Sequence, residues 1–158
     1  GLQTIPCECF ANSGVEEIEL PRGVRCIEDK AFRCCKDLRC IVADGVEVIG
    51  EYAFAESGLE SFCASSSLRK IKSYAFTDCK ALRHVDLRNG QKDLLSEDSG
   101  LEIGYKAFYG SGLETFAAPP SLQRIDDLAF GACRALRSLQ LGRDTQLGWL
   151  CLWGTAVT

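Results

Sequence analysis

The 158-residue chain contains no methionine, one histidine, four prolines and two tryptophans. A single histidine excludes mechanisms that need two imidazoles. No segment approaches the roughly 18 consecutive apolar residues of a membrane-spanning helix, and no basic stretch followed by an apolar core marks a secretion signal. A net charge of −4 argues against nucleic-acid binding, which depends on a basic surface. With 46% hydrophobic and 25% charged residues, the composition fits one soluble globular domain.

An internal repeat of about 22 residues dominates the sequence. Each turn has an aromatic residue, usually preceded by alanine, with an isoleucine five residues before the aromatic. The aromatic positions are Phe10, Phe32, Phe54, Phe76, Phe108, Phe130 and Trp153, and the isoleucines are Ile5, Ile27, Ile49, Ile71, Ile103 and Ile125. Gly148 falls at the isoleucine position of the last turn. The 32-residue interval between Phe76 and Phe108 indicates a ten-residue insertion in one turn.

The apolar spacing within a turn predicts a short strand with one face inward. Val15, Ile18 and Leu20 form such a run, as do the residues from Leu82 to Leu87. The Ala-Phe stretch that follows predicts a tight or short helical corner. A single turn buries one edge and cannot be stable alone, so stacked turns must share a continuous core.

This pattern resembles the BspA-like, or Treponema-type, leucine-rich repeats. The resemblance covers nearly all of residues 5–157 and is closest at Asp44-Gly45-Val46-Glu47-Val48-Ile49-Gly50-Glu51-Tyr52-Ala53-Phe54. The insertion and the last turn, with Trp153 and Gly148, depart from it. The resemblance implies a right-handed solenoid with a parallel β-sheet on its concave face and short helical or extended corners on its convex face. It also implies adhesion or protein binding, often at microbial surfaces.

Two kinds of turn alternate along the chain. One carries Ser-Gly-(Leu/Val)-Glu after the aromatic, as at Ser57 to Glu60, and the other carries Cys-x-x-Leu-Arg, as at Cys79 to Arg83. The residues after the first strand leucine or valine therefore alternate in charge: Glu16, Arg39, Glu60, Arg83, Glu114 and Arg137. Since stacked strands lie about 4.8 Å apart, these side chains predict a ladder of opposite charges. The ladder either fixes the register or forms a recognition stripe.

The ten cysteines do not predict a disulfide scaffold. Cys35, Cys79 and Cys133 recur every second turn, about 9–10 Å apart by strand spacing, which is too far for disulfides. We expect these three, and Cys9 at an alanine position, to be buried thiols. The remaining cysteines should face outward: Cys7, Cys26, Cys34, Cys40, Cys63 and Cys151. A Cys40–Cys63 bridge is conceivable but not favoured, and Cys34, Cys35 and Cys40 lack the usual spacing of zinc ligands.

The insertion is expected to loop out near residues 90–100, at the edge of the concave sheet. Its Leu94-Leu95 pair suggests a small hydrophobic anchor for a partner, although a long surface loop is also tolerated without any function. No nucleophile elbow, phosphate-binding glycine loop or isolated carboxylate pair is present. We therefore expect no enzymatic activity, cofactor or metal, and His84 is interpreted as a surface residue.

The sequence thus predicts one leucine-rich-repeat domain over residues 1–158, with about seven turns of 22–23 residues. Because neither end has a polar cap, we expect a piece of a longer array with flanking repeats. The predicted role is a non-catalytic scaffold that binds a protein or matrix partner at a cell surface, with no nucleic acid and no membrane span. An intracellular adaptor, favoured by reduced thiols and the missing signal, or a structural spacer are the alternatives. The candidate partner-binding residues are Glu17, Glu19, Glu60, Arg83, His84, Asp86, Leu94, Leu95, Glu114, Arg137 and Gln140.

Overall fold

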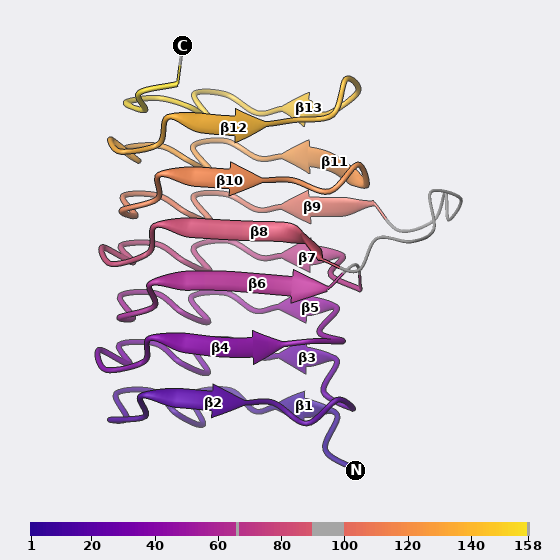
Figure 1. The fold of residues 1–158 in the computed structure, drawn as a ribbon, viewed down its shortest axis with the longest axis vertical. Coiled ribbons are helices and arrows are strands. Elements are labelled where there is room, and N and C mark those ends of the chain that lie inside the picture. Colours follow the sequence, from indigo (N-terminus) through magenta and orange to yellow (C-terminus); the bar gives the residue numbers. More distant parts are fainter. Residues whose placement is uncertain (66, 90–99, 158) are drawn as a thin grey trace.

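The chain forms a stack of turns with one parallel sheet along each of two sides (Figure 1). The computed structural model describes residues 1–65, 67–89 and 100–157. The chain runs one way along the front sheet and returns along the rear sheet while it rises from the N-terminus to the C-terminus (Figure 1). This path makes the coil right-handed, as predicted.

The front sheet has six strands and the rear sheet has seven. The front strands are β2 (Glu17–Glu19), β4 (Cys40–Ala43), β6 (Ser61–Ser65), β8 (His84–Asn89), β10 (Thr115–Ala117) and β12 (Ser138–Gln140). The rear strands are β1 (Thr4–Ile5), β3 (Cys26–Ile27), β5 (Val48–Ile49), β7 (Lys70–Ile71), β9 (Leu101–Ile103), β11 (Leu122–Ile125) and β13 (Gln146–Leu147). The sequence pattern predicted the front sheet, whereas the second sheet was not expected.

Aromatic stacking fills the space between the sheets. The rings of Phe10, Phe32 and Phe54 lie parallel, with centroids 5.1 and 5.2 Å apart, and the same stack continues to Phe130. From Phe32 to Phe130 these rings are fully buried, and the isoleucines of the rear strands lie in the same core. The phenylalanine and isoleucine positions of the repeat are therefore core positions, because each side chain packs on its counterpart in the next turn.

The predicted helical corners are not helical in the described part of the chain. Backbone N–H groups alternate between two kinds of partner: Ala31 and Arg33 donate within their own turn, whereas Phe32 and Cys34 donate to the next turn. Two residues in each corner have a left-handed backbone conformation, with φ angles of 50–72°. They are Glu8 and Asn12, Lys30 and Cys34, Tyr52 and Glu56, Tyr74 and Asp78, Lys106 and Gly110, Leu128 and Ala132, and Leu150 and Gly154. Bonding between turns thus replaces the i to i−4 pattern of a helix.

The two kinds of turn differ by one residue between the aromatic and the front strand. Ile18 therefore pairs with Ile41, 23 residues on, whereas Val42 pairs with Cys63, 21 residues on. The cysteine turns have one residue fewer between the front strand and the next rear strand. Ile27 therefore pairs with Ile49, 22 residues on. This alternation keeps the two sheets in step and explains why turns come in pairs.

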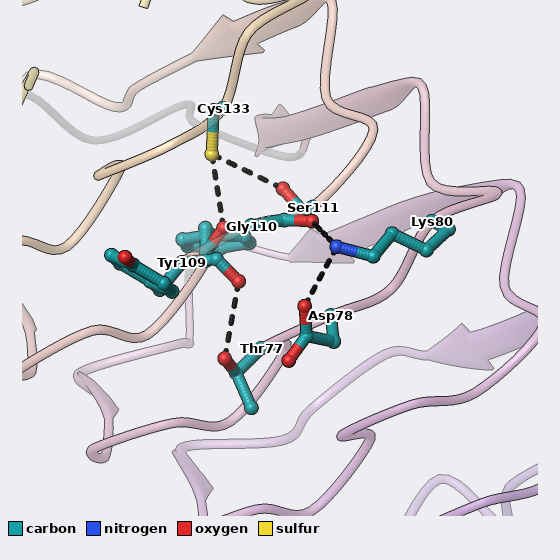
Figure 2. Close-up of polar contacts among 8 residues, drawn as sticks. Thr77, Asp78, Lys80, Tyr109, Gly110, Ser111 and Cys133 are labelled. Carbon is teal, nitrogen blue, oxygen red and sulfur yellow. Dashed lines mark hydrogen bonds and ion pairs between the residues drawn. The ribbon is translucent and has the colours of Figure 1, made fainter. Parts of the chain in front are cut away.

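The buried thiols occupy the junction between the two kinds of turn. Cys133 Sγ donates to the Phe108 carbonyl at 3.0 Å and lies 3.3 Å from Ser111 Oγ (Figure 2). Cys79 makes the same two contacts with Phe54 and Ser57. Lys80 Nζ adds a third link, at 2.6 Å to the Gly110 carbonyl and 2.7 Å to Asp78 Oδ1 (Figure 2). The serine–cysteine alternation therefore joins neighbouring turns through hydrogen bonds.

Four predictions about the end turns were wrong: Gly148 at the isoleucine position, Trp153 at the aromatic position, an outward-facing Cys151 and a buried Cys9. Leu147, not Gly148, pairs with Ile125, and the Phe130 N–H donates to the Cys151 carbonyl. Cys151 thus occupies the alanine position and is buried, while Leu152 packs on the core and Trp153 is 54% exposed. Cys9, expected to be buried, is exposed because no earlier turn covers it. Leu94 and Leu95 lie outside the described residues.

Candidate functional site

The outward side of the front sheet presents two columns of side chains, which we call the outward face. Strand pairing aligns Glu17 with Cys40, Ser61 with His84, and His84 with Thr115 in the first column. The second column follows the pairs from Glu19 through Val42, Cys63 and Asp86 to Ala117 and Gln140. The first column is Glu17, Cys40, Ser61, His84, Thr115 and Ser138, and the second is Glu19, Val42, Cys63, Asp86, Ala117 and Gln140. Most of these side chains are small or uncharged.

Five of the predicted partner-binding residues lie on this face: Glu17, Glu19, His84, Asp86 and Gln140. Four others directly precede a front strand and border the face, namely Glu60, Arg83, Glu114 and Arg137. The sequence reasoning missed Cys40, Val42, Ser61, Cys63, Thr115, Ala117 and Ser138. They lie one or three residues after a residue of the predicted charge ladder, and this spacing could have identified them, but the sequence reasoning favoured charged side chains over small ones.

The six residues of the predicted charge ladder lie side by side along the entry edge of the front sheet. Backbone hydrogen bonds link each ladder residue to the next, from Arg39 N–H to the Glu16 carbonyl through to Arg137. Side chains pair at Arg39–Glu60, with 2.6 Å between nitrogen and oxygen, and at Arg83–Glu114, with 3.8 Å. Among the described residues, Glu16 and Arg137 form no ion pair. The side-chain ladder is therefore made of separate pairs.

A hollow of about 270 Å³ opens on the face between β8, β10 and β12. It exists because Thr115, Ala117 and Ser138 are short beside the longer side chains of His84, Arg88 and Gln140. His84 Nδ1 lies 2.8 Å from Thr115 Oγ1. Arg88 holds both Asp86 carboxylate oxygens, through Nε at 3.1 Å and a terminal nitrogen at 3.0 Å. Hydrogen bonds from Arg88 lower the pKa of Asp86, so the hollow is lined by a neutralised ion pair and neutral polar groups.

The cysteines on the face are unbonded thiols. All ten cysteines are free, and Cys63 pairs with Val42, two residues out of step with Cys40. Burial, followed by the nearby Asp86 carboxylate and Cys40, raises the pKa of the Cys63 thiol. Protonated thiols are weakly polar, so Cys40 and Cys63 extend the apolar surface of Val42. In the described part of the chain, no group of three His, Cys, Asp or Glu residues is arranged to hold a metal ion.

Across residues 1–65, 67–89 and 100–157, no helix is long and apolar enough to cross a membrane.

Comparison with solved structures finds the same architecture in leucine-rich repeat proteins. A leucine-rich repeat protein from Bacteroides ovatus superposes with a TM-score of 0.68 at 24% identity, over 99% of this chain and 46% of that chain. One from Eubacterium ventriosum gives 0.68 at 20% identity, over 91% and 38%. The pneumococcal vaccine antigen PcpA gives 0.59 at 19% identity, over 98% and 34%. This chain thus spans less than half the length of each, and the likenesses establish the fold.

A search of curated proteins finds no significant match. The family model for the BspA type leucine rich repeat region matches six copies, over residues 3–134 and 101–148. These matches contain the stacked phenylalanines, the rear-strand isoleucines and all the front strands. The chain therefore belongs to the BspA-type leucine-rich repeat family.

Proposed function

We propose that this chain is a non-catalytic protein-binding module, that its outward face is the docking surface, and that it serves in adhesion at a cell surface. The observation that carries the proposal is the outward face itself. It combines small uncharged side chains and the apolar Val42 with a polar hollow and a charged border. Interfaces that bind proteins typically have such an uncharged centre within a polar rim. Leucine-rich repeats are, in general, protein-interaction modules.

Two solved relatives support the surface role. One is described as a leucine rich cell surface protein from Faecalibacterium prausnitzii, with 21% identity and a TM-score of 0.55. The other is PcpA, whose description as a vaccine antigen is compatible with exposure to a host. These descriptions concern those proteins. At such low sequence identity, only the fold is shared with this chain. The matrix or host partner of this chain is therefore part of the proposal.

A bead-adhesion assay tests the proposed function. Beads coated with this chain should adhere to surfaces carrying fibronectin, fibrinogen or collagen, or to epithelial cells. Ala117→Gln fills the hollow without adding charge, so it should reduce adhesion severalfold. Thr4→Gln, on the rear strand β1, serves as a matched control. Adhesion that neither variant reduces would exclude the outward face as the docking surface.

One observation favours a second candidate, an intracellular adaptor. All ten cysteines are free, including the exposed Cys7, Cys9, Cys40 and Cys63. Exposed unpaired thiols are more common in reducing compartments than outside cells. Localising the full-length protein in its own cells by fractionation distinguishes the adaptor from the adhesin. A structural spacer is the remaining alternative, and it requires that no outward-face substitution changes partner binding.

A further inference from the structure

The charges around the outward face are neutralised in the middle of the stack but not at the β2 end. Arg39 pairs with Glu60, Arg83 pairs with Glu114, and Asp86 with Arg88. Glu17 and Glu19, in contrast, have neither an ion pair nor a side-chain hydrogen bond within the described residues, and both are exposed. Glu16 lies beside them on the border. Residues 16–22 thus carry three carboxylates and one guanidinium, that of the exposed Arg22.

An apolar surface adjoins these carboxylates on the next two strands. Glu17 pairs with Cys40 and Glu19 with Val42, while Val42 in turn pairs with Cys63. Val42 is 45% exposed, which is unusual for a branched apolar side chain on an internal strand. Cys40, two residues before Val42 on β4, and Cys63, its partner on β6, are also exposed. We call Cys40, Val42 and Cys63 the apolar patch.

The polar hollow follows the apolar patch on β8 to β12. The outward face therefore changes from strand to strand. The unpaired carboxylates lie on β2, the apolar patch on β4 and β6, and the polar hollow on β8 to β12. From β2 to β10 there are four strand spacings, or about 19 Å. An extended segment of about six residues covers that length, at roughly 3.3 Å per residue.

Building on the proposed function, we infer that the outward face binds an extended protein segment that crosses the strands, with basic side chains over Glu17 and Glu19. In this arrangement an apolar side chain of the segment covers the apolar patch, and a hydrogen-bonding side chain enters the hollow. Complementary charge fixes the direction of the segment. Burial of the apolar side chain excludes water from the centre. A segment with acidic residues at that end would be repelled.

Binding of defined peptides tests the inference. The probe is a fluorescent octapeptide with two lysines at one end, a central leucine and serine elsewhere, and its counterpart has glutamates in place of the lysines. Fluorescence anisotropy should show binding of the lysine peptide at least tenfold tighter than the counterpart. The double variant Glu17→Gln, Glu19→Gln should weaken binding about fivefold to tenfold, since each exposed pair contributes little. Val42→Ser should weaken it about threefold.

A matched double variant separates local complementarity from the overall negative charge. Glu51→Gln with Asp144→Asn also removes two exposed carboxylates, but away from the outward face, so it should leave binding unchanged. Equal weakening by the two double variants, stronger binding of the glutamate peptide, or no binding of the lysine peptide would each overturn the inference. Circular dichroism of every variant verifies that the stack is intact.

The outcome also distinguishes this inference from the proposed function. If Ala117→Gln lowers adhesion while the substitutions at Glu17 and Glu19 change neither adhesion nor peptide binding, the outward face remains the docking surface. The basic segment is then the wrong partner.

Discussion

At the scale of single residues, buried thiols act as small hydrogen-bond donors. Cys79 Sγ lies 3.0 Å from the Phe54 carbonyl and 3.5 Å from Ser57 Oγ. Burial raises the pKa of this thiol from 9.0 to about 11, an effect that the hydrogen bonds from Ser57 partly offset. The native structure therefore favours the protonated thiol over the thiolate.

The raised pKa of Cys79 predicts a loss of stability in alkali. Its contribution should be complete below pH 9, the ordinary thiol pKa, and should be lost as pH rises to about 11. Two pKa units correspond to at most about 2–3 kcal/mol. Chemical denaturation at pH 8, 10 and 11 should show a steeper fall in the free energy of unfolding for the native chain than for Cys79→Ser, which lacks the titrating thiol. Parallel pH curves for the two proteins would contradict the assignment.

Glycine in the Ser-Gly turns is required by the backbone of the preceding cysteine turn. A Cβ at Gly58 or Gly112 would overlap the carbonyl oxygen of Lys36 or Lys80, respectively. Gly14 has the same place in the first turn, where the nearest atom would be 3.8 Å away. We expect Gly58→Ala to cost about 1–3 kcal/mol of stability and Gly14→Ala to cost much less. Similar melting temperatures for the two variants would show that the carbonyl contact does not matter.

At the scale of elements, alternation between turns determines which charges meet. The residues before the front strands are linked through their backbones, so opposite charges stand beside one another throughout the entry edge. Side chains pair at Arg39–Glu60 and Arg83–Glu114, and the idea that the ladder fixes the register stays a prediction. Its role in recognition stays a prediction.

Charge reversal at Arg83 tests the ladder. Arg83→Glu removes the ion pair to Glu114 and the hydrogen bond to the Gly112 carbonyl, and it places a carboxylate between Glu60 and Glu114. Because these side chains are exposed, we expect a loss of about 1 kcal/mol, with partial recovery in high salt. Arg137→Glu, at a position without an ion pair in the described chain, should cost less. An unchanged melting temperature for Arg83→Glu would count against the ladder.

At the scale of the whole molecule, stability depends on contacts between neighbouring turns. Phe76 stacks between Phe54 and Phe108, and its ring also lies 4.9 Å from Phe62. Phe10 stacks on Phe32 alone. A central phenylalanine therefore joins the two halves of the stack, whereas the first one holds a single turn.

Truncation of these two phenylalanines should separate the roles. Phe76→Ala is expected to cost about 3–5 kcal/mol and to broaden urea unfolding, because the two halves of the stack lose their coupling. Phe10→Ala should cost less and release the first turn alone. Hydrogen exchange followed by mass spectrometry should then show lost protection on both sides of Phe76 in one variant, and at residues 1–20 in the other. Uniform loss in both variants would argue for a single cooperative unit.

The sequence alone determined the period, the stacked phenylalanines, the front strands and the charge alternation. Each of these depends on residues that meet their own counterparts at a fixed interval, so spacing reveals them. The rear sheet was missed because strands of two to four residues leave no alternating pattern. The corners were predicted as tight or short helical because local spacing does not reveal that every second N–H bonds to the next turn.

Only the tertiary structure reveals the hollow in the candidate site. The hollow depends on Thr115, Ala117 and Ser138 lying beside His84 and Gln140, and these residues are far apart in the chain. The ends of the stack likewise depend on neighbours: Cys9 and Cys151 share the alanine position, yet the first is exposed and the second is buried. The repeat in the sequence specifies the place of each residue within a turn. Whether its side chain is buried or exposed depends on the presence of a neighbouring turn that covers it.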